Sequence, residues 1–174
     1  TEFVAILIDT SASLQQSGLW EQVEQKLNDR LKRLPESAVI GLFRFDDPWS
    51  TLVSFSEAES LGSAANRTLI QERLRELKPT WQGTRLGEGL ARTAQAVQEA
   101  QAGRTLPCPQ RVWLVSDLQS GSDLAALREF DWPDDLPVEW IALQPKSGEN
   151  AGLQLVAAAV DSADDRLRVR VSNA

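Results

Sequence analysis

The chain of 174 residues contains no histidine, a single cysteine and no methionine. The lack of histidine excludes a Ser-His-Asp triad, a histidine general base and a histidine-ligated metal. The single cysteine, Cys108, excludes an internal disulfide and a multi-cysteine zinc site. A net charge of −7, with no cluster of Lys or Arg, argues against a nucleic-acid surface. No stretch is long and apolar enough to cross a bilayer.

The length suffices for one well-buried domain with a small appendage. The chain lacks methionine and ends on strand-like sequence, so we expect it to be a piece excised from a longer protein. Membrane-spanning segments would then lie in the flanks.

The stretch Phe3–Ser13, FVAILIDTSAS, contains the most informative pattern. Its first six residues are apolar and rich in β-branched side chains, which predicts a fully buried central strand of a parallel sheet. It continues with Asp9, Ser11 and Ser13 at alternate positions. Open α/β sheets bind ligands at the carboxyl ends of their strands, and a carboxylate with two hydroxyls offers hard oxygen ligands for Mg²⁺. The alternative is that Asp9 or Ser11 caps the next helix.

Strands and helices alternate up to residue 144. Apolar residues at spacings of three and four predict helices, and short apolar runs predict strands. The expected helices are 19–34, 66–78 (with Asn66 as its cap) and 86–102, with a short one from Ser122 to Phe130; the further strands are 39–45, 51–55, 111–116 and 138–143. This order predicts a doubly wound α/β fold whose sheet is mostly parallel, with 51–55 as an antiparallel edge strand.

The last part of the chain has a different pattern. A largely apolar run at 153–160 is followed by a polar turn, and apolar residues then alternate with arginines at 166–171. This pattern predicts a β-hairpin. We therefore divide the chain into a domain at 1–146 and, at 147–174, a hairpin appendage or the start of a truncated β domain.

Three loops carry the candidate site: Asp9-x-Ser11-x-Ser13, Gly83-Thr84 before a helix, and Asp117 after a strand. Together they resemble the metal-ion-dependent adhesion site of the von Willebrand factor type A (vWA) domain, over roughly Thr1–Leu143. The resemblance implies a Rossmann-like vWA fold. It also implies that the site binds Mg²⁺, with Mn²⁺ or Ca²⁺ as alternatives.

By that resemblance, Ser11 and Ser13 would bind the metal directly, and Thr84 would bind it in the ligand-occupied state. Asp9 and Asp117 would act largely through bound waters. A cation that so few carboxylates neutralise can accept a carboxylate from a partner protein. The family's C-terminal helix has no counterpart after Leu143, so the resemblance does not extend to a switch that moves this helix.

Other readings of these residues remain open. Thr84 is alternatively a helix cap, and Asp117 a turn residue. Trp81 and Gln82 are candidate contacts for a partner, with core packing as the alternative for Trp81. The remaining interpretations are that Ser116 fills space beside Asp117, that Asp46 and Asp47 form a solvated turn rather than an acidic rim, and that Trp113 and Trp140 lie in the core.

The leading hypothesis is a metal-dependent protein-interaction module without enzymatic activity. One alternative is a Mg²⁺-dependent phosphoryl-transfer or hydrolytic enzyme with Asp9 as nucleophile, although Ser11 stands where haloacid-dehalogenase-type phosphatases have a second Asp, and no phosphate-binding loop is present. Another is a scaffold with a vestigial site. The chain also resembles bacterial membrane proteins related to aerotolerance regulators, which implies a membrane-tethered parent with this domain outside the cytoplasm.

Overall fold

The computed structural model describes residues 1–16, 18–46, 48–81, 83, 85–118, 123–144, 151–156 and 168–173. Its contacts divide the chain into two compact units, Thr1–Gln144 and Pro145–Ala174. Each unit is described by itself.

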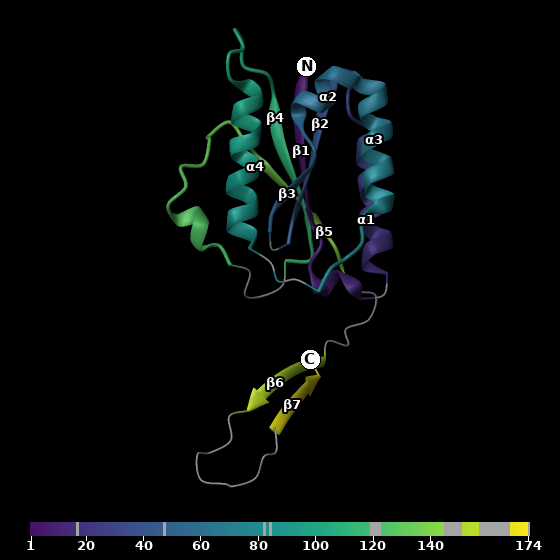
Figure 1. Cartoon of the computed structure of the whole chain (residues 1–174), viewed down its shortest axis with the longest axis vertical. Coiled ribbons are helices and arrows are strands. Elements are labelled where there is room, and N and C mark those ends of the chain that lie inside the picture. The colour runs from purple at the N-terminus through teal and green to yellow at the C-terminus, as the bar shows by residue number, and fades with distance from the viewer. Residues whose placement is uncertain are drawn as a thin grey trace. The chain divides into compact units, whose positions relative to one another are not determined.

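The first unit is built on a five-stranded sheet with the strand order β3-β2-β1-β4-β5 (Figure 1). β1 pairs in parallel with both β2 and β4, and β4 pairs in parallel with β5. β3 runs antiparallel to β2 at the edge. This is the predicted mostly parallel sheet with one antiparallel edge strand. The bounds are β1 Glu2–Asp9, β2 Ala38–Phe45, β3 Ser50–Val53, β4 Gln110–Ser116 and β5 Val138–Ala142.

The central position predicted for the first strand is confirmed. From Phe3 onward every residue of β1 is buried. Because side chains alternate across a strand, Val4, Ile6 and Ile8 pack into one hydrophobic cluster and their neighbours into another. A strand with core on both sides has no solvent-facing surface, and this explains its uninterrupted apolar sequence.

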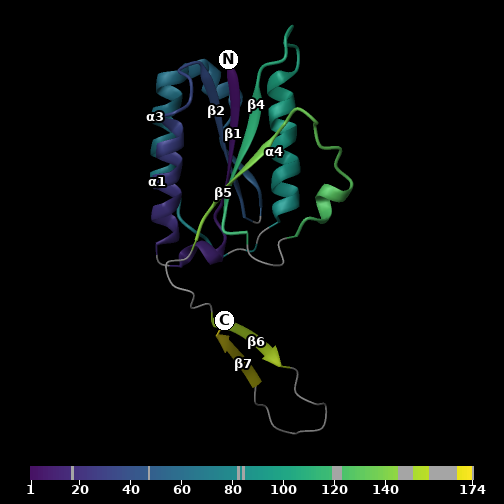
Figure 2. The same cartoon turned by 180° about the vertical axis from the view of Figure 1, so that it is seen from behind.

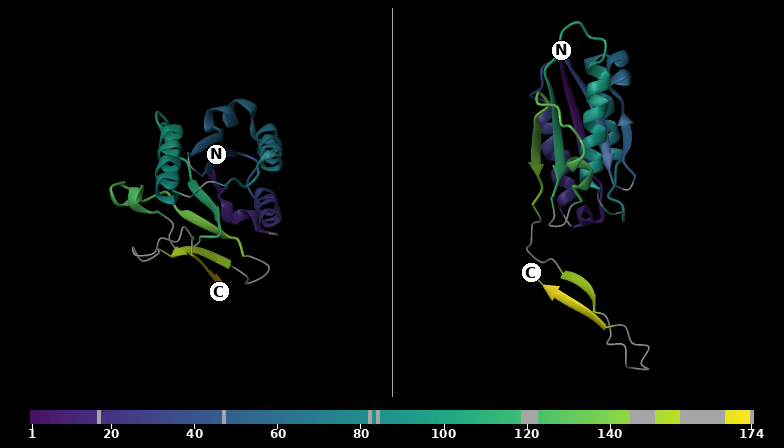
Figure 3. Two further views of the ribbon diagram at one scale, coloured as in Figure 1. Left: turned by 60° about the horizontal axis from the view of Figure 1, so that its bottom comes forward. Right: turned by 90° about the vertical axis from the view of Figure 1, so that its left-hand side faces the viewer.

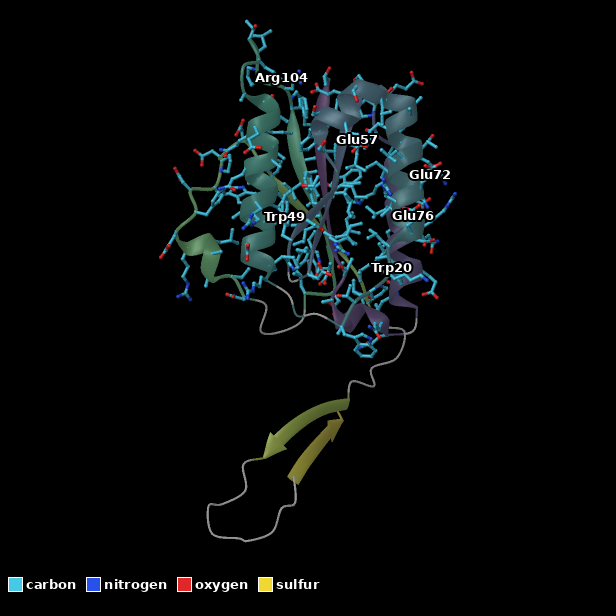
Figure 4. All side chains as sticks on the ribbon, viewed as in Figure 1. Trp20, Trp49, Glu57, Glu72, Glu76 and Arg104 are labelled. Atoms are coloured by element: carbon cyan, nitrogen blue, oxygen red, sulfur yellow. The ribbon has the colours of Figure 1, made fainter. Side chains whose placement is uncertain are left out.

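Helices cover both faces of this sheet (Figures 1 and 2). α1 (Leu19–Leu31) and α3 (Ser63–Glu76) lie on one face, and α4 (Leu86–Gln101) lies on the other. The apolar stripe of α1 is buried as the spacing predicts, whereas Glu72 and Glu76 on the outer face of α3 point away from the sheet (Figure 4). The doubly wound architecture is therefore as predicted.

Between β3 and the middle of α3, two details differ from the sequence-based expectation. A short helix, α2 (Phe55–Leu61), was not predicted: Phe55 begins this helix rather than ending a strand, and the Ser54 side chain caps it by accepting a hydrogen bond from Glu57 N. Asn66 does not cap α3 but lies within it, fully buried. Its amide donates to Ile40 O and accepts from Ile40 N, both at 3.0 Å, which ties α3 to β2.

Between β4 and β5 lies a 3₁₀ helix, η2 (Ala125–Arg128). The sequence predicts a helix from Ser122 to Phe130, so the observed one is shorter; Ser122 itself lies outside the described residues. Among the described residues no helix is both long and apolar enough to pass through a membrane.

The second unit contains β6 (Ala151–Val156) and β7 (Arg168–Asn173). The two strands pair antiparallel, from Ala151 opposite Asn173 to Val156 opposite Arg168. This pairing agrees with the predicted hairpin. The predicted turn at 161–165 and the domain boundary at 146 lie outside the described residues.

Candidate metal site

The carboxyl ends of three neighbouring strands meet at one edge of the sheet. Asp9 ends β1, Asp46 follows β2, and Ser116 ends β4 with Asp117 directly after it. The register places Asp9 opposite Phe45 of β2, and Ile8 opposite Val115 of β4. The left panel of Figure 3 brings this end of the unit toward the viewer. It is the edge at which open α/β sheets bind ligands.

Asp9 is 2% exposed and is held at both carboxylate oxygens. Oδ1 accepts a hydrogen bond from the backbone N–H of Ser11 at 2.9 Å, and Oδ2 accepts one from the Ser116 hydroxyl at 2.7 Å. Burial raises the pKa of Asp9, and the negative charge of Asp117 raises it further, while the hydrogen bonds from Ser11 and Ser116 oppose the rise. The two carboxyl groups are therefore close enough to interact, and a cation between them would favour ionised Asp9.

Ser11 and Ser13 bring their hydroxyls together, with 3.1 Å between the two Oγ atoms. Ser11 occupies the N-cap position of the 3₁₀ helix η1 (Ala12–Gln15), but its side chain makes no capping hydrogen bond. The capping interpretation of Ser11 is therefore wrong. Neighbouring ligands of an octahedral Mg²⁺, each about 2.1 Å from the metal, lie about 3.0 Å apart. The observed hydroxyl spacing fits two such positions.

The sequence predicts that Ser116 merely fills space, but in the structure both its hydroxyl and its carbonyl make hydrogen bonds. Its hydroxyl donates to Asp9 Oδ2 and accepts from the N–H of Leu118 at 3.0 Å, while its carbonyl accepts from Trp140 Nε1 at 2.9 Å. Leu118 has a φ of 41°, in the left-handed region that non-glycine residues rarely occupy. Ser116 thus fixes both the buried carboxylate and the turn after Asp117.

The prediction that both strand tryptophans lie in the core is half right. Trp113 is 3% exposed, but Trp140, on the edge strand β5, is 50% exposed. The sequence predicts the same burial for both because each lies within a short strand-like run, although Trp140 directly follows Glu139. Only the sheet order shows that β5 has a neighbour on one side alone.

Asp46 also differs from its expected role. It is 4% exposed, so the interpretation as a solvated turn residue is wrong, while Asp47 lies outside the described residues. Its Oδ2 accepts a hydrogen bond from the Thr80 hydroxyl at 3.1 Å, and the Thr80 N–H donates to Thr10 O at 2.7 Å. The loop before α4 is thereby bound to the ends of β1 and β2. The sequence offered no signal for this role of Thr80.

The remaining predicted site residues are only partly described. Thr84 and Gln82 lie outside the described residues, and Asp117 is half-buried. Trp81 is 85% exposed, which excludes core packing and keeps it as a candidate partner contact. The first turn of α4 is close to the site: a Cβ on Gly89 would lie 2.7 Å from Phe45 Cβ, so glycine is required for this approach of α4 to β2.

Within the described part of the chain, no group of three or more His, Cys, Asp or Glu side chains is arranged to hold a metal. Any cation at this edge would therefore rely on hydroxyl and water oxygens as well as on Asp9 and Asp117. Such a donor set suits a hard cation, not Zn²⁺ or copper.

Comparison with known proteins agrees with the fold. The family model of the von Willebrand factor type A domain matches residues 4–120, more than half of the chain. No curated protein sequence matches the chain.

Among solved structures, an aerotolerance-related membrane protein from Bacteroides fragilis is similar at a TM-score of 0.62 and 14% identity, covering 99% of this chain and 82% of that one. BatB, a conserved hypothetical protein from Bacteroides thetaiotaomicron, is similar at a TM-score of 0.59 and 15% identity, and the match covers 99% of this chain and 80% of BatB. Proximal thread matrix protein 1 from the mussel byssus is similar at a TM-score of 0.59 and 15% identity, and the match covers 80% of this chain and 37% of that protein. At these identities the similarity concerns the fold.

Proposed function

We propose that this chain, which belongs to the von Willebrand factor type A domain family, is a metal-dependent protein-interaction module. Proteins with vWA domains commonly act as interaction modules. The finer claim is that Ser11, Ser13 and Thr84 hold Mg²⁺ directly, with Asp9 and Asp117 acting through water. A carboxylate of the partner then completes the coordination.

The spacing of the Ser11 and Ser13 hydroxyls carries this proposal. Two Oγ atoms 3.1 Å apart at the carboxyl edge of a parallel sheet match adjacent positions of a Mg²⁺ octahedron. Asp9 supports it as well: because each of its oxygens already accepts a hydrogen bond, its remaining lone pairs suit metal-bound water. The proposed ligands supply hydroxyls and water, so the cation keeps positive charge to attract a partner's carboxylate.

We propose binding rather than catalysis because Asp9 is buried. A nucleophilic Asp9 would have to contact the phosphorus of a substrate directly, which a side chain this buried cannot do, whereas a single water molecule can lie between Asp9 and a cation. Mg²⁺-dependent hydrolysis of phosphate esters that is lost in Asp9→Asn would contradict this.

Calorimetric titration with Mg²⁺ and Mn²⁺ tests the metal site. We expect saturable binding to the wild-type chain that is abolished in Asp9→Ala and weakened in Ser13→Ala. Ser56→Ala, on α2, is the matched control and should bind like the wild type. The assignment fails if Asp9→Ala or Ser13→Ala binds as tightly as the wild type.

The partner's carboxylate is tested with Mn²⁺ and the relaxation rate of water protons. Acetate or a glutamate-containing peptide should displace water from bound Mn²⁺ and lower the relaxation rate, whereas the matching glutamine peptide should not. Trp81, which is 85% exposed, is the proposed contact surface for the partner, and Gln82, the following residue in the sequence, is a second candidate. Trp81→Ala should weaken binding of a cognate partner without changing metal affinity. An equal response to both peptides would contradict the carboxylate claim.

We further propose that the parent protein is bacterial and tethered to a membrane, with this domain outside the cytoplasm. The support is the fold similarity to the membrane protein from Bacteroides fragilis. The full natural reading frame should then remain in the membrane fraction after a carbonate wash, and protease added to spheroplasts should cleave this domain. Recovery of the full-length protein in the soluble fraction would contradict tethering.

A further inference from the structure

Thr80 joins the loop before α4 to two strand ends. Its N–H donates to the Thr10 carbonyl at 2.7 Å, and its hydroxyl lies 3.0 Å from that carbonyl and 3.1 Å from Asp46 Oδ2. Its own carbonyl accepts a hydrogen bond from Gln15 Nε2 in η1 at 3.1 Å. The backbone and side chain of this one residue therefore contact the β1 loop, the end of β2 and η1.

Asp46 is an unusual residue to find buried there. It is 4% exposed, and its Oδ1 has no hydrogen-bond partner among the residues that the structure describes. The guanidinium of Arg44 lies 3.7 Å from Oδ1, but its Nε donates to the Ser50 hydroxyl at 2.8 Å. A buried carboxylate that is only partly hydrogen-bonded costs stability, and an apolar side chain of similar size would not. Among the described residues, the carboxylate accepts a hydrogen bond from Thr80 alone, and this contact gives a reason for burying Asp46 here.

We propose that Asp46 and the Thr10 carbonyl clamp Thr80, and so fix the start of the segment that leads to α4 beside the strand ends of the metal site. Asp46 is then a positioning residue and not a ligand, because Oδ2 is engaged by Thr80 and the Arg44 cation beside Oδ1 would repel a metal ion. The inference rests on the proposed function, since the loop includes Thr84. Changing residues that orient metal ligands typically weakens metal affinity by 10–100-fold.

Two substitutions at Asp46 separate a clamp from a charge effect. Asp46→Asn keeps an oxygen that can accept the Thr80 hydroxyl but removes the negative charge. Asp46→Leu keeps a similar volume and removes both. If Asp46 acts as a clamp, Asp46→Asn retains the affinity for Mn²⁺ and Asp46→Leu weakens it about tenfold. If it acts through charge, both variants lose affinity alike, and the inference is wrong.

Thr80→Val removes the other half of the clamp and keeps the shape of the side chain. We expect it to weaken Mn²⁺ binding about tenfold as well. Thr93→Val is the matched control: Thr93 is fully buried and its hydroxyl donates to Gly89 O at 2.7 Å, outside the contacts of the clamp. It should lower stability and leave Mn²⁺ affinity unchanged. Wild-type affinity in both Thr80→Val and Asp46→Leu would overturn the inference.

Amide hydrogen exchange of the metal-free protein supplies a second readout. The Thr80 N–H should exchange faster in Asp46→Leu than in the wild type, while the midpoint of global unfolding is not lowered. A merely structural residue would lower the midpoint and raise exchange throughout the domain. If the wild type binds no metal, the proposed function fails, whereas an unchanged Thr80 exchange rate in Asp46→Leu refutes the clamp by itself.

Discussion

Replacing Ser116 by alanine tests whether the buried Asp9 carboxylate belongs to the metal site. The Ser116 hydroxyl donates to Asp9 Oδ2 at 2.7 Å and accepts from Leu118 N at 3.0 Å. A hydrogen bond to a charged group contributes about 1.5–3 kcal/mol, so Ser116→Ala should lower the free energy of unfolding by up to that amount. Ionised Asp9 loses a donor in a buried place, which raises its pKa further.

The affinity for Mn²⁺ should fall in Ser116→Ala as well, by about tenfold or more. Asp9 loses the hydroxyl that orients it, and its carboxyl group is then more readily protonated. Ser54→Ala is the matched control: Ser54 caps α2 and its loss costs about 1 kcal/mol without touching the site. Urea unfolding and calorimetric Mn²⁺ titration of both variants measure the two effects. If Ser116→Ala loses stability but binds Mn²⁺ like the wild type and Ser54→Ala, the assignment of Asp9 to the metal site is refuted.

Other substitutions test neighbouring parts of the account. Because the folded-state pKa of Asp9 is raised, its contribution to stability in the metal-free protein is present below its ordinary pKa and is lost as the pH rises through the raised value. As the pH rises from acid to neutral, the free energy of unfolding of the wild type should therefore fall relative to that of Asp9→Asn, as measured by urea unfolding. A difference between the two proteins that does not change with pH would contradict this. Gly89→Ala places a Cβ 2.7 Å from Phe45 Cβ and should cost about 1–3 kcal/mol in urea unfolding; an unchanged midpoint would contradict the tight packing of α4 on β2. Asn66→Ala leaves the N–H and the carbonyl of Ile40 without their partners, which should cost about 2–4 kcal/mol while Mn²⁺ affinity is retained; lost affinity would show that α3 bears on the site.

The sequence predicts the fold well where pattern and burial coincide. The uninterrupted apolar run of β1 reflects core on both faces, and the stripe of α1 reflects one buried face. It fails where a polar residue is buried for tertiary reasons. Asn66 is a residue type typical of helix caps, but its side chain hydrogen-bonds to a neighbouring strand. The helix α2 begins at the Ser54 cap, and its sequence is too short to show a periodic pattern.

Some features of the candidate site could likewise be predicted from the sequence, and others could not. The alternate spacing of Asp9, Ser11 and Ser13 is local, so the proximity of the two hydroxyls could be expected from the sequence. The roles of Ser116 and Thr80 could not, because each depends on hydrogen bonds to residues from other parts of the chain. The sequence predicts a solvated Asp46 for the same reason: a turn sequence does not show that Thr80, far along the chain, contacts it.

Anomalous diffraction from a crystal grown or soaked with Mn²⁺ tests the central claim most directly. The proposed site predicts one strong peak at the carboxyl edge of the sheet, at about 2.1–2.3 Å from the hydroxyl oxygens of both Ser11 and Ser13. It also predicts that Asp9 and Asp117 reach the ion through water. No peak at millimolar Mn²⁺, or a peak bound only to exposed surface carboxylates, would contradict it.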